Sequence, residues 1–138
     1  RLGAFGYVGK EEVHSVAFGS PVENDITMWG IDATLSLKDK LELNVQYLTR
    51  MDDETFAHNN SINVSKDVES EGILAELVYS PNGDQSDWYA VGMYNYFDSD
   101  FSYLEYESAS FHLGYVLRRN LRLVTEYSYN LTNEFGKY

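Results

Sequence analysis

Long segments in which the character of the side chain changes at every second residue constrain the fold of this chain most. The clearest is 41–50, where one set of alternate positions is apolar and the other mainly polar: Leu41, Leu43, Val45 and Tyr47 against Glu42, Asn44 and Gln46. Successive side chains of a β-strand point to opposite faces of its sheet. The segment therefore predicts a strand with one apolar face and one polar face.

The same alternation recurs along the chain and predicts about seven strands in total. They are expected at 2–10, 26–37, 41–50, 72–80, 88–97, 108–117 and 121–129. Both sets of positions are apolar in 88–97, so the sequence does not orient this strand. The pattern contains no amphipathic helix, and with 43% hydrophobic residues it does not indicate disorder. The chain is therefore predicted to be all-β.

The connections between these segments alternate in length. Tight turns are expected at 38–40, 81–84 and 118–120, and long acidic loops at 11–25, 51–71 and 98–107. An up-and-down antiparallel sheet places tight turns at one end and long loops at the other, as in outer-membrane barrels. The pattern predicts an antiparallel up-and-down transmembrane β-barrel that occupies 1–138 as a single segment, with no separate soluble domain.

Alternation alone does not decide which face lies inside, because a soluble barrel buries its apolar face and a membrane barrel exposes it to lipid. Two features favour the membrane. Segments such as 26–37 are long enough to cross a bilayer, which takes about 9–11 residues. Aromatic residues flank an aliphatic band, with Tyr79, Trp88 and Tyr115 near the tight turns and Trp29, Tyr47, Tyr127 and Tyr129 near the long loops. Tyrosine is, however, common in any sheet.

This interpretation assigns side chains to two environments. The polar face is expected to line a water-filled lumen and set its selectivity, through Asp32, Glu42, Arg50, Glu76, His112, Arg122 and Glu126. The apolar face is expected to contact lipid, through Trp29, Leu43, Val45, Tyr47, Leu77, Phe111, Leu113, Leu123 and Tyr127. A charge facing lipid at the bilayer midplane costs about 2–4 kcal/mol, which accounts for the segregation. The lumen charges are expected either to create a field across a pore or to pair and fill a narrow one.

Four segments resemble Gram-negative outer-membrane porins and porin-like barrels, the broad type that includes phosphate-selective porins. They are WGIDATLSLKDKLELNVQYL, AELVYSPNG, YAVGMYNYFDSD and LGYVLRRNLRLVTEYSYN, and the likeness spans most of 25–130. The resemblance implies a water-filled pore, an even strand number and often a trimer. Seven strands is odd and 131–138 alternates little, so one or more closing strands are expected to be missing. Phosphate-selective members use basic ladders, which two strand arginines and an acidic rim do not match.

Other functional classes are disfavoured by composition. The formal net charge of −12 would repel nucleic acid, and the absence of cysteine excludes thiolate metal sites. No run of about 18 apolar residues predicts a membrane-spanning helix. The acidic MDDE at 51–54 and DSD at 98–100 offer oxygen ligands, but their spacing matches no defined calcium loop. Ser110 and His112 share a strand face without an assigned acid partner, so we predict no catalytic residue, metal or cofactor.

The sequence therefore predicts a passive outer-membrane pore for small hydrophilic solutes or ions, without anion selectivity, in a Gram-negative bacterium. Its expected partners are outer-membrane lipid, the solutes, and either further copies of itself or a partner protein. One alternative keeps the barrel as a scaffold or sheath for a partner, such as an electron-transfer or envelope protein. Another is a soluble lipocalin-like barrel that binds an apolar ligand inside.

Overall fold

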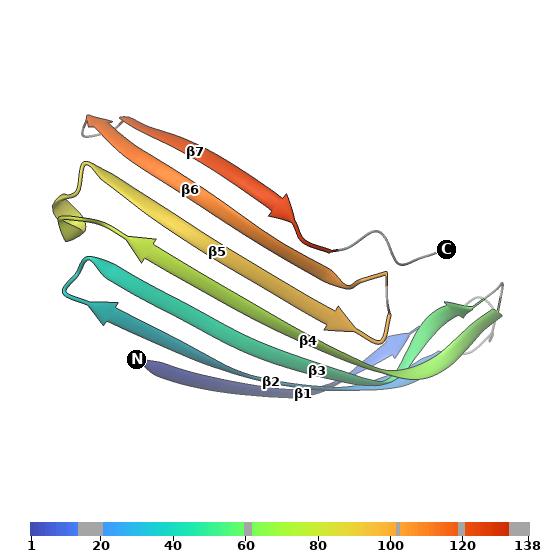
Figure 1. Ribbon diagram of the computed structural model, residues 1–138. Helices are drawn as coiled ribbons and strands as arrows, with labels where there is room; N and C mark the ends of the chain where they lie inside the picture. Colours follow the sequence, from blue (N-terminus) through green and yellow to red (C-terminus); the bar gives the residue numbers. More distant parts are fainter. Residues whose placement is uncertain (14–20, 60–61, 102, 119–120, 133–138) are drawn as a thin grey trace.

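In the computed structural model, the chain forms one antiparallel sheet whose neighbouring strands follow the order of the sequence (Figure 1). The structure describes residues 1–13, 21–59, 62–101, 103–118 and 121–132. The strands are β1 (Leu2–Val13), β2 (Val22–Leu37), β3 (Leu41–Asn59), β4 (Ile62–Tyr79), β5 (Trp88–Ser99), β6 (Tyr106–Arg118) and β7 (Leu121–Asn130). A single 3-10 turn, η1 (Gly83–Gln85), precedes β5 in this described part of the chain. The prediction of seven antiparallel up-and-down strands is confirmed.

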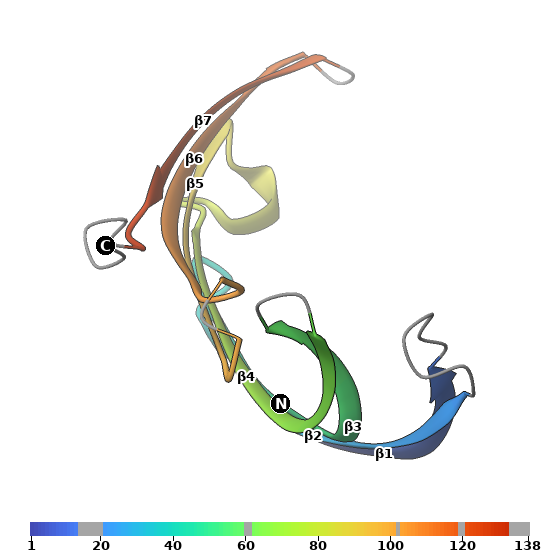
Figure 2. The ribbon, with the colours of Figure 1, turned by 90° about the vertical axis from the view of Figure 1, so that its right-hand side faces the viewer.

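The sheet is open, with β1 and β7 as its two edges. Figure 2 shows that it curves into an arc and that the outer part of the β3–β4 hairpin turns toward the concave side. Closure into a barrel and passage through a membrane stay predictions. No helix in the described ranges has the length and apolar character needed to span a bilayer.

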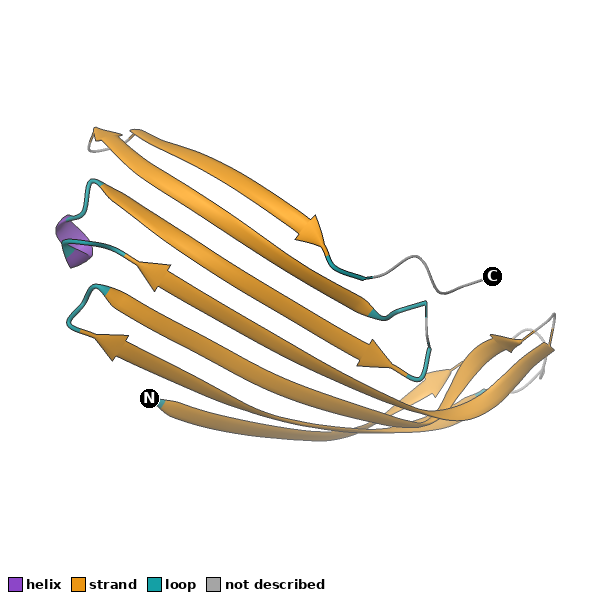
Figure 3. Ribbon diagram, in the orientation of Figure 1, coloured by secondary structure: helices purple, strands orange, loops and turns teal. Residues whose placement is uncertain are grey.

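The tight connections gather at one end of the sheet (Figure 3). Between β2 and β3, Lys38 and Asp39 both have positive φ, and the Lys40 N–H donates to the Leu37 carbonyl at 3.1 Å. Two successive left-handed residues form a type I′ turn, whose twist matches that of the flanking strands. This turn fixes the register of the β2–β3 pair. Of the third predicted turn, 119–120 lie outside the described residues.

The register joins the apolar faces of separate strands into one surface. Residues directly opposite in an antiparallel pair point to the same side of the sheet. One such row crosses six strands through Leu35, Leu43, Leu77, Gly92, Phe111 and Tyr127. Through Gly92 the row also orients β5, placing Ala90 and Tyr94 on the apolar face and Val91 and Met93 on the polar face. The sequence left this orientation open.

The predicted long loops at 11–25 and 51–71 are wrong for the residues that the structure describes there, since nearly all of these lie in strands. The β3–β4 pairing extends to Asn59 and Ile62, and the β1–β2 pairing extends to Val13 and Val22. In the sequence, charged and polar residues follow one another directly at 11–12, 23–25 and 52–54, which interrupts the two-residue alternation that marks a half-buried strand. The loop predicted at 98–107 is shorter than expected, because β5 ends at Ser99 and β6 begins at Tyr106.

The polar face is the concave one. Apart from Thr49, the buried side chains in the described part of the chain all lie on it: Asn24, Ile26, Asp52, Val68, Ser99 and Ser108. They gather toward the end of the sheet opposite the tight turns, where the β3–β4 hairpin extends to Asn59 and Ile62. There the register of β3 with β4 shifts between Asp52 and Thr55. Such a β-bulge bends a strand, and it lies where the hairpin turns inward.

Candidate functional site

Two carboxylates share one amide donor on the polar face, toward the tight turns. The Asn44 Nδ2 donates to Glu42 at 3.1 Å and to Glu76 at 3.0 Å. The Ser36 hydroxyl donates to the second Glu42 oxygen at 3.1 Å. The structure thus brings together two of the predicted lumen residues, Glu42 and Glu76, through an amide that stabilises both negative charges. No basic side chain neutralises either acid within the described residues.

Two further predicted lumen residues meet across β6 and β7. His112 and Glu126 are opposite each other in the register, with 3.7 Å between the imidazole Nδ1 and the carboxylate Oε2. The Ser128 hydroxyl donates to the other Glu126 oxygen at 3.1 Å, and Ser110 lies 3.4 Å from His112 Nε2. The imidazole therefore has both an acid and a hydroxyl beside it. The sequence linked His112 to Ser110 and did not find Glu126 as its partner.

Arg50 is held by Asp52, which lies two residues along the same strand face. The guanidinium Nε and Nη2 donate to the two carboxylate oxygens, both at 2.7 Å. The Asn24 amide on β2 donates to the same carboxylate at 2.8 Å. The Arg50 hydrogen bonds lower the pKa of Asp52 below its ordinary value, and Asn24 adds to this, although partial burial opposes it. Among the described residues, this cluster has more hydrogen bonds than the other polar groups of the concave face.

The other predicted lumen residues remain apart from these groups. Asp32 lies over Gly3 of β1, because a methyl group placed on this glycine would fall 2.1 Å from the carboxylate. Arg122 stands opposite Val116 and forms no ion pair within the described ranges. Among the described residues, the predicted acids of this face therefore do not form ion pairs with its two predicted arginines. Arg50 instead pairs with Asp52, an acid that the sequence placed in a loop.

The apolar face is a band without charge that ends at a line of ionic residues. Counting from the tight turns, and beyond Arg118 in the pair next to the β6–β7 turn, the first charged residue on this face is Lys10 in β1, Asp25 in β2, Glu71 in β4, Asp98 in β5 and Glu107 in β6, while β3 has none to Met51 and β7 none to Tyr129. All nine residues predicted to contact lipid lie in this band: Trp29, Leu43, Val45, Tyr47, Leu77, Phe111, Leu113, Leu123 and Tyr127. Several are largely exposed, including Phe111 at 51% and Leu123 at 59%.

Aromatic residues occur at both limits of this band. Near the tight turns, the rings of Tyr79 and Trp88 pack edge to face with centroids 5.7 Å apart. At the opposite limit, Tyr47 packs on Trp29 at 5.5 Å and donates its hydroxyl to Glu71 at 2.9 Å. The Tyr94 hydroxyl donates to Glu107 at the same distance. The tyrosines therefore bridge the apolar band and the carboxylate line, a relationship that alternation within single strands does not reveal.

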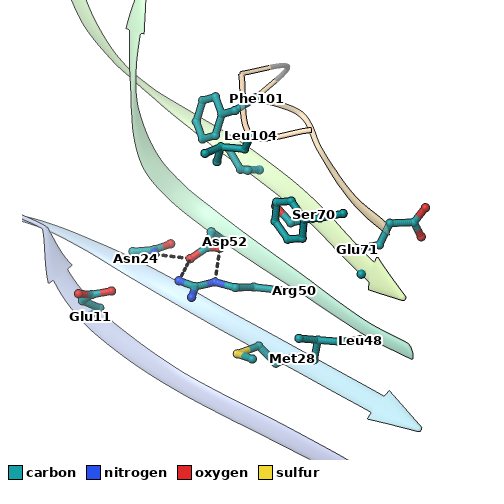
Figure 4. Close-up of a pocket in the computed structure, with 13 residues that line it drawn as sticks. Glu11, Asn24, Met28, Leu48, Arg50, Asp52, Ser70, Glu71, Phe101 and Leu104 are labelled. Atoms are coloured by element: carbon teal, nitrogen blue, oxygen red, sulfur yellow. Dashed lines mark hydrogen bonds and ion pairs between the residues drawn. The ribbon is translucent and has the colours of Figure 1, made fainter. Parts of the chain in front are cut away.

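A cavity of about 540 Å³ opens on the concave face beside the Arg50–Asp52 cluster (Figure 4). Its lining comes from β1 to β5 and from the β5–β6 connection: Glu11, Asn24, Met28, Leu48, Arg50, Asp52, Val68, Ser70, Glu71, Gly72, Phe97, Phe101 and Leu104. The sequence did not indicate this site, because its residues belong to six different segments.

The acidic residues near the cavity form no metal centre in the described part of the chain, where no group of three or more potential ligands has a suitable arrangement. The segment 51–54 lies in β3 instead of a loop. Lys10 offsets part of the negative charge by pairing with Glu23 and with Asp25, the latter at 3.1 Å. Both acids raise the pKa of Lys10, chiefly through hydrogen bonds.

Comparisons of the chain with models of protein families, with curated proteins and with solved structures found no match.

Proposed function

We propose that this chain forms part of the wall of an outer-membrane pore, with its apolar face toward lipid and its polar face toward water. Small hydrophilic solutes or ions would pass through by diffusion. The proposal depends on one observation: the charge-free band crosses all seven strands and ends at the line of charged residues that includes Lys10, Asp25 and Glu71. Contiguous exposed apolar surface of this extent is rare on soluble monomers and marks a surface that another phase or molecule covers.

The dimensions of the band suit a bilayer. On β2 it covers residues 27–37, which at about 3.3 Å per residue and a tilt of about 45° rise roughly 25 Å. This is the height of the apolar band of outer-membrane barrels. The Tyr79–Trp88 and Trp29–Tyr47 pairs lie at its two limits, where aromatic side chains favour the membrane–water interface.

The polar face supports a preference for cations. Glu42 and Glu76 lie side by side through Asn44 without a basic partner in the described residues, and Asp32 also lacks one. Arg50 does not offset these negative charges, because its Nε and Nη2 both donate to Asp52. Carboxylates that line a water-filled passage raise the local concentration of cations.

The lipocalin-like alternative receives less support, since it requires the apolar face to lie inside. Leu77 and Phe111 are 44% and 51% exposed, and the concave side carries the polar groups. The sheath alternative shares the lipid-facing band and differs only in what occupies the concave side.

Conductance separates these functions. The full-length protein, purified in detergent and added to a planar bilayer, is expected to give discrete steps of current with a cation-dependent reversal potential. Inserted protein that carries no current would contradict the pore and favour the sheath. Protein that stays soluble without detergent would contradict both.

A further inference from the structure

The cavity beside Arg50 and Asp52 has the size and lining of a ligand site. Its volume of about 540 Å³ falls in the range of small-molecule pockets, about 300–1,000 Å³. We propose that it binds a small molecule with a primary ammonium group on an apolar body of roughly one aromatic ring. This site is independent of conduction, because it requires only that the concave face is open to solvent.

The apolar part of the cavity accounts for the body of the ligand. Met28, Leu48 and Phe97 line it from three strands. Phe101 and Leu104 line it from the β5–β6 connection, at the other end of the view from Met28 and Leu48 (Figure 4). Such side chains favour an uncharged ring or short alkyl group, since burying apolar area stabilises the complex by about 25 cal/mol per Å².

Gly72 leaves room in the floor of this cavity. It stands opposite Leu48 in β3 and opposite Phe97 in β5, and it presents no side chain between them. A methyl group at this position would meet its nearest neighbours, Phe97 and the Tyr96 carbonyl, at 3.6 Å, which is ordinary van der Waals contact. Alanine is therefore expected to fit, while a longer side chain would occupy the space of the ligand.

The polar end of the cavity favours a cation. Arg50 and Asp52 neutralise each other through two hydrogen bonds, and Asn24 takes up a further acceptor site of the carboxylate. Glu71 also lines the cavity, but its carboxylate accepts the Tyr47 hydroxyl. Glu11 remains, and within the described residues it has no hydrogen bond or ion pair, although its charge acts on Arg50.

An ammonium group placed near Glu11 would gain from two interactions. The carboxylate attracts the ammonium directly, and the apolar body of the same ligand can enter the part of the cavity that Met28, Leu48 and Phe97 line. A carboxylate ligand would instead meet the charge of Glu11 and an arginine that already has a bonded partner. The balance of charges at this end of the cavity therefore favours an amine over an acid.

Three probes with one ring and different head groups test the proposal: 2-phenylethylammonium, 2-phenylethanol and 3-phenylpropionate. Each is titrated by calorimetry into the full-length protein in detergent. The amine is expected to bind about tenfold more tightly than the alcohol, and the acid more weakly than both. Glu11→Gln should remove the advantage of the amine. Gly72→Leu should abolish binding of all three, while the matched variant Gly72→Ala should retain it.

Equal affinity for the three probes, or an unchanged preference in Glu11→Gln, would overturn the proposal. Preference for the acid would assign the site to Arg50 instead and would also overturn it. Chemical shifts or thermal unfolding of Gly72→Leu show whether that variant folds, and Glu11→Gln alters a surface residue, so it tests the charge without this concern. Current through a bilayer is measured separately, so loss of the pore and loss of the ligand site are distinguishable.

Discussion

The side chain of Asn24 on β2 donates a hydrogen bond of 2.8 Å to Asp52 on β3 and accepts one of 3.1 Å from the backbone N–H of Glu54. Both of its polar atoms are thereby satisfied at the β-bulge, and the residue is 2% exposed. Asn24 thus bonds to both ends of the irregular segment from which the β3–β4 hairpin bends. The amide fixes a distortion that backbone pairing alone leaves unsupported.

Replacing Asn24 with alanine is expected to destabilise the protein by about 1–3 kcal/mol, because the Glu54 N–H and Asp52 would each lose a buried partner. Unfolding by urea in detergent, followed by tryptophan fluorescence, measures the change. Ser36→Ala is the matched control, since it removes one exposed hydrogen bond to Glu42. Identical midpoints for Asn24→Ala and the control would contradict this role.

The depressed pKa of Asp52 predicts a dependence of stability on pH. A carboxylate whose pKa is lower in the folded state stabilises the fold fully above its unfolded pKa of about 4 and loses that effect as the pH falls through the folded value. Wild type is therefore expected to unfold at a higher temperature than Asp52→Asn near neutral pH. The difference should shrink below about pH 4. A constant difference across this range would show that protonation of Asp52 does not contribute.

Arginine substitutions test the orientation of the two faces. Val45→Arg and Leu123→Arg each place a charge in the apolar band, where facing lipid would cost about 2–4 kcal/mol at the bilayer midplane. Both variants are expected to fail in membrane assembly. Asn44→Arg lies one residue from Val45 on the opposite face, between two acids, and should assemble. Heat-dependent mobility of unboiled samples on gels reports assembly, and equal behaviour of all three variants would refute the assignment.

Neutralising Glu42 and Glu76 together as glutamines is expected to lower cation preference if the polar face lines a pore. The reversal potential in a salt gradient measures this preference. Glu107→Gln provides the control, because Glu107 lies on the other face and bonds to Tyr94. A reversal potential that does not move in the double variant would remove both acids from the selectivity determinants.

Strand faces could be predicted from single segments only where the two faces differ. For 41–50 and 121–129 alternation was enough, and the register merely aligned faces already assigned. For β5 it was not, because Val91 and Met93 are as apolar as Ala90. Its orientation follows from the pairing of Gly92 with Leu77 and Phe111, which is a property of the sheet.

The Arg50–Asp52 pair was within reach of the sequence, since residues two apart on a strand share a face. It was missed because the predicted strand ends at Arg50, where the alternation of apolar and polar residues stops. Asp52 was therefore assigned to a loop. Asn24 and Glu11 required more, namely the register counted outward from the turn at Lys38 and Asp39. The cavity depends on curvature and on a connection folding back, and neither is encoded in any local pattern.

The odd number of strands in the sheet fixes the relative direction of its two edge strands. Since neighbours alternate, β1 and β7 run the same way, and they cannot join each other by an antiparallel ladder. Identical copies arranged around an axis parallel to the strands would meet the same obstacle at every junction. A ring that contains these seven strands and is antiparallel throughout must therefore include an odd number of further strands.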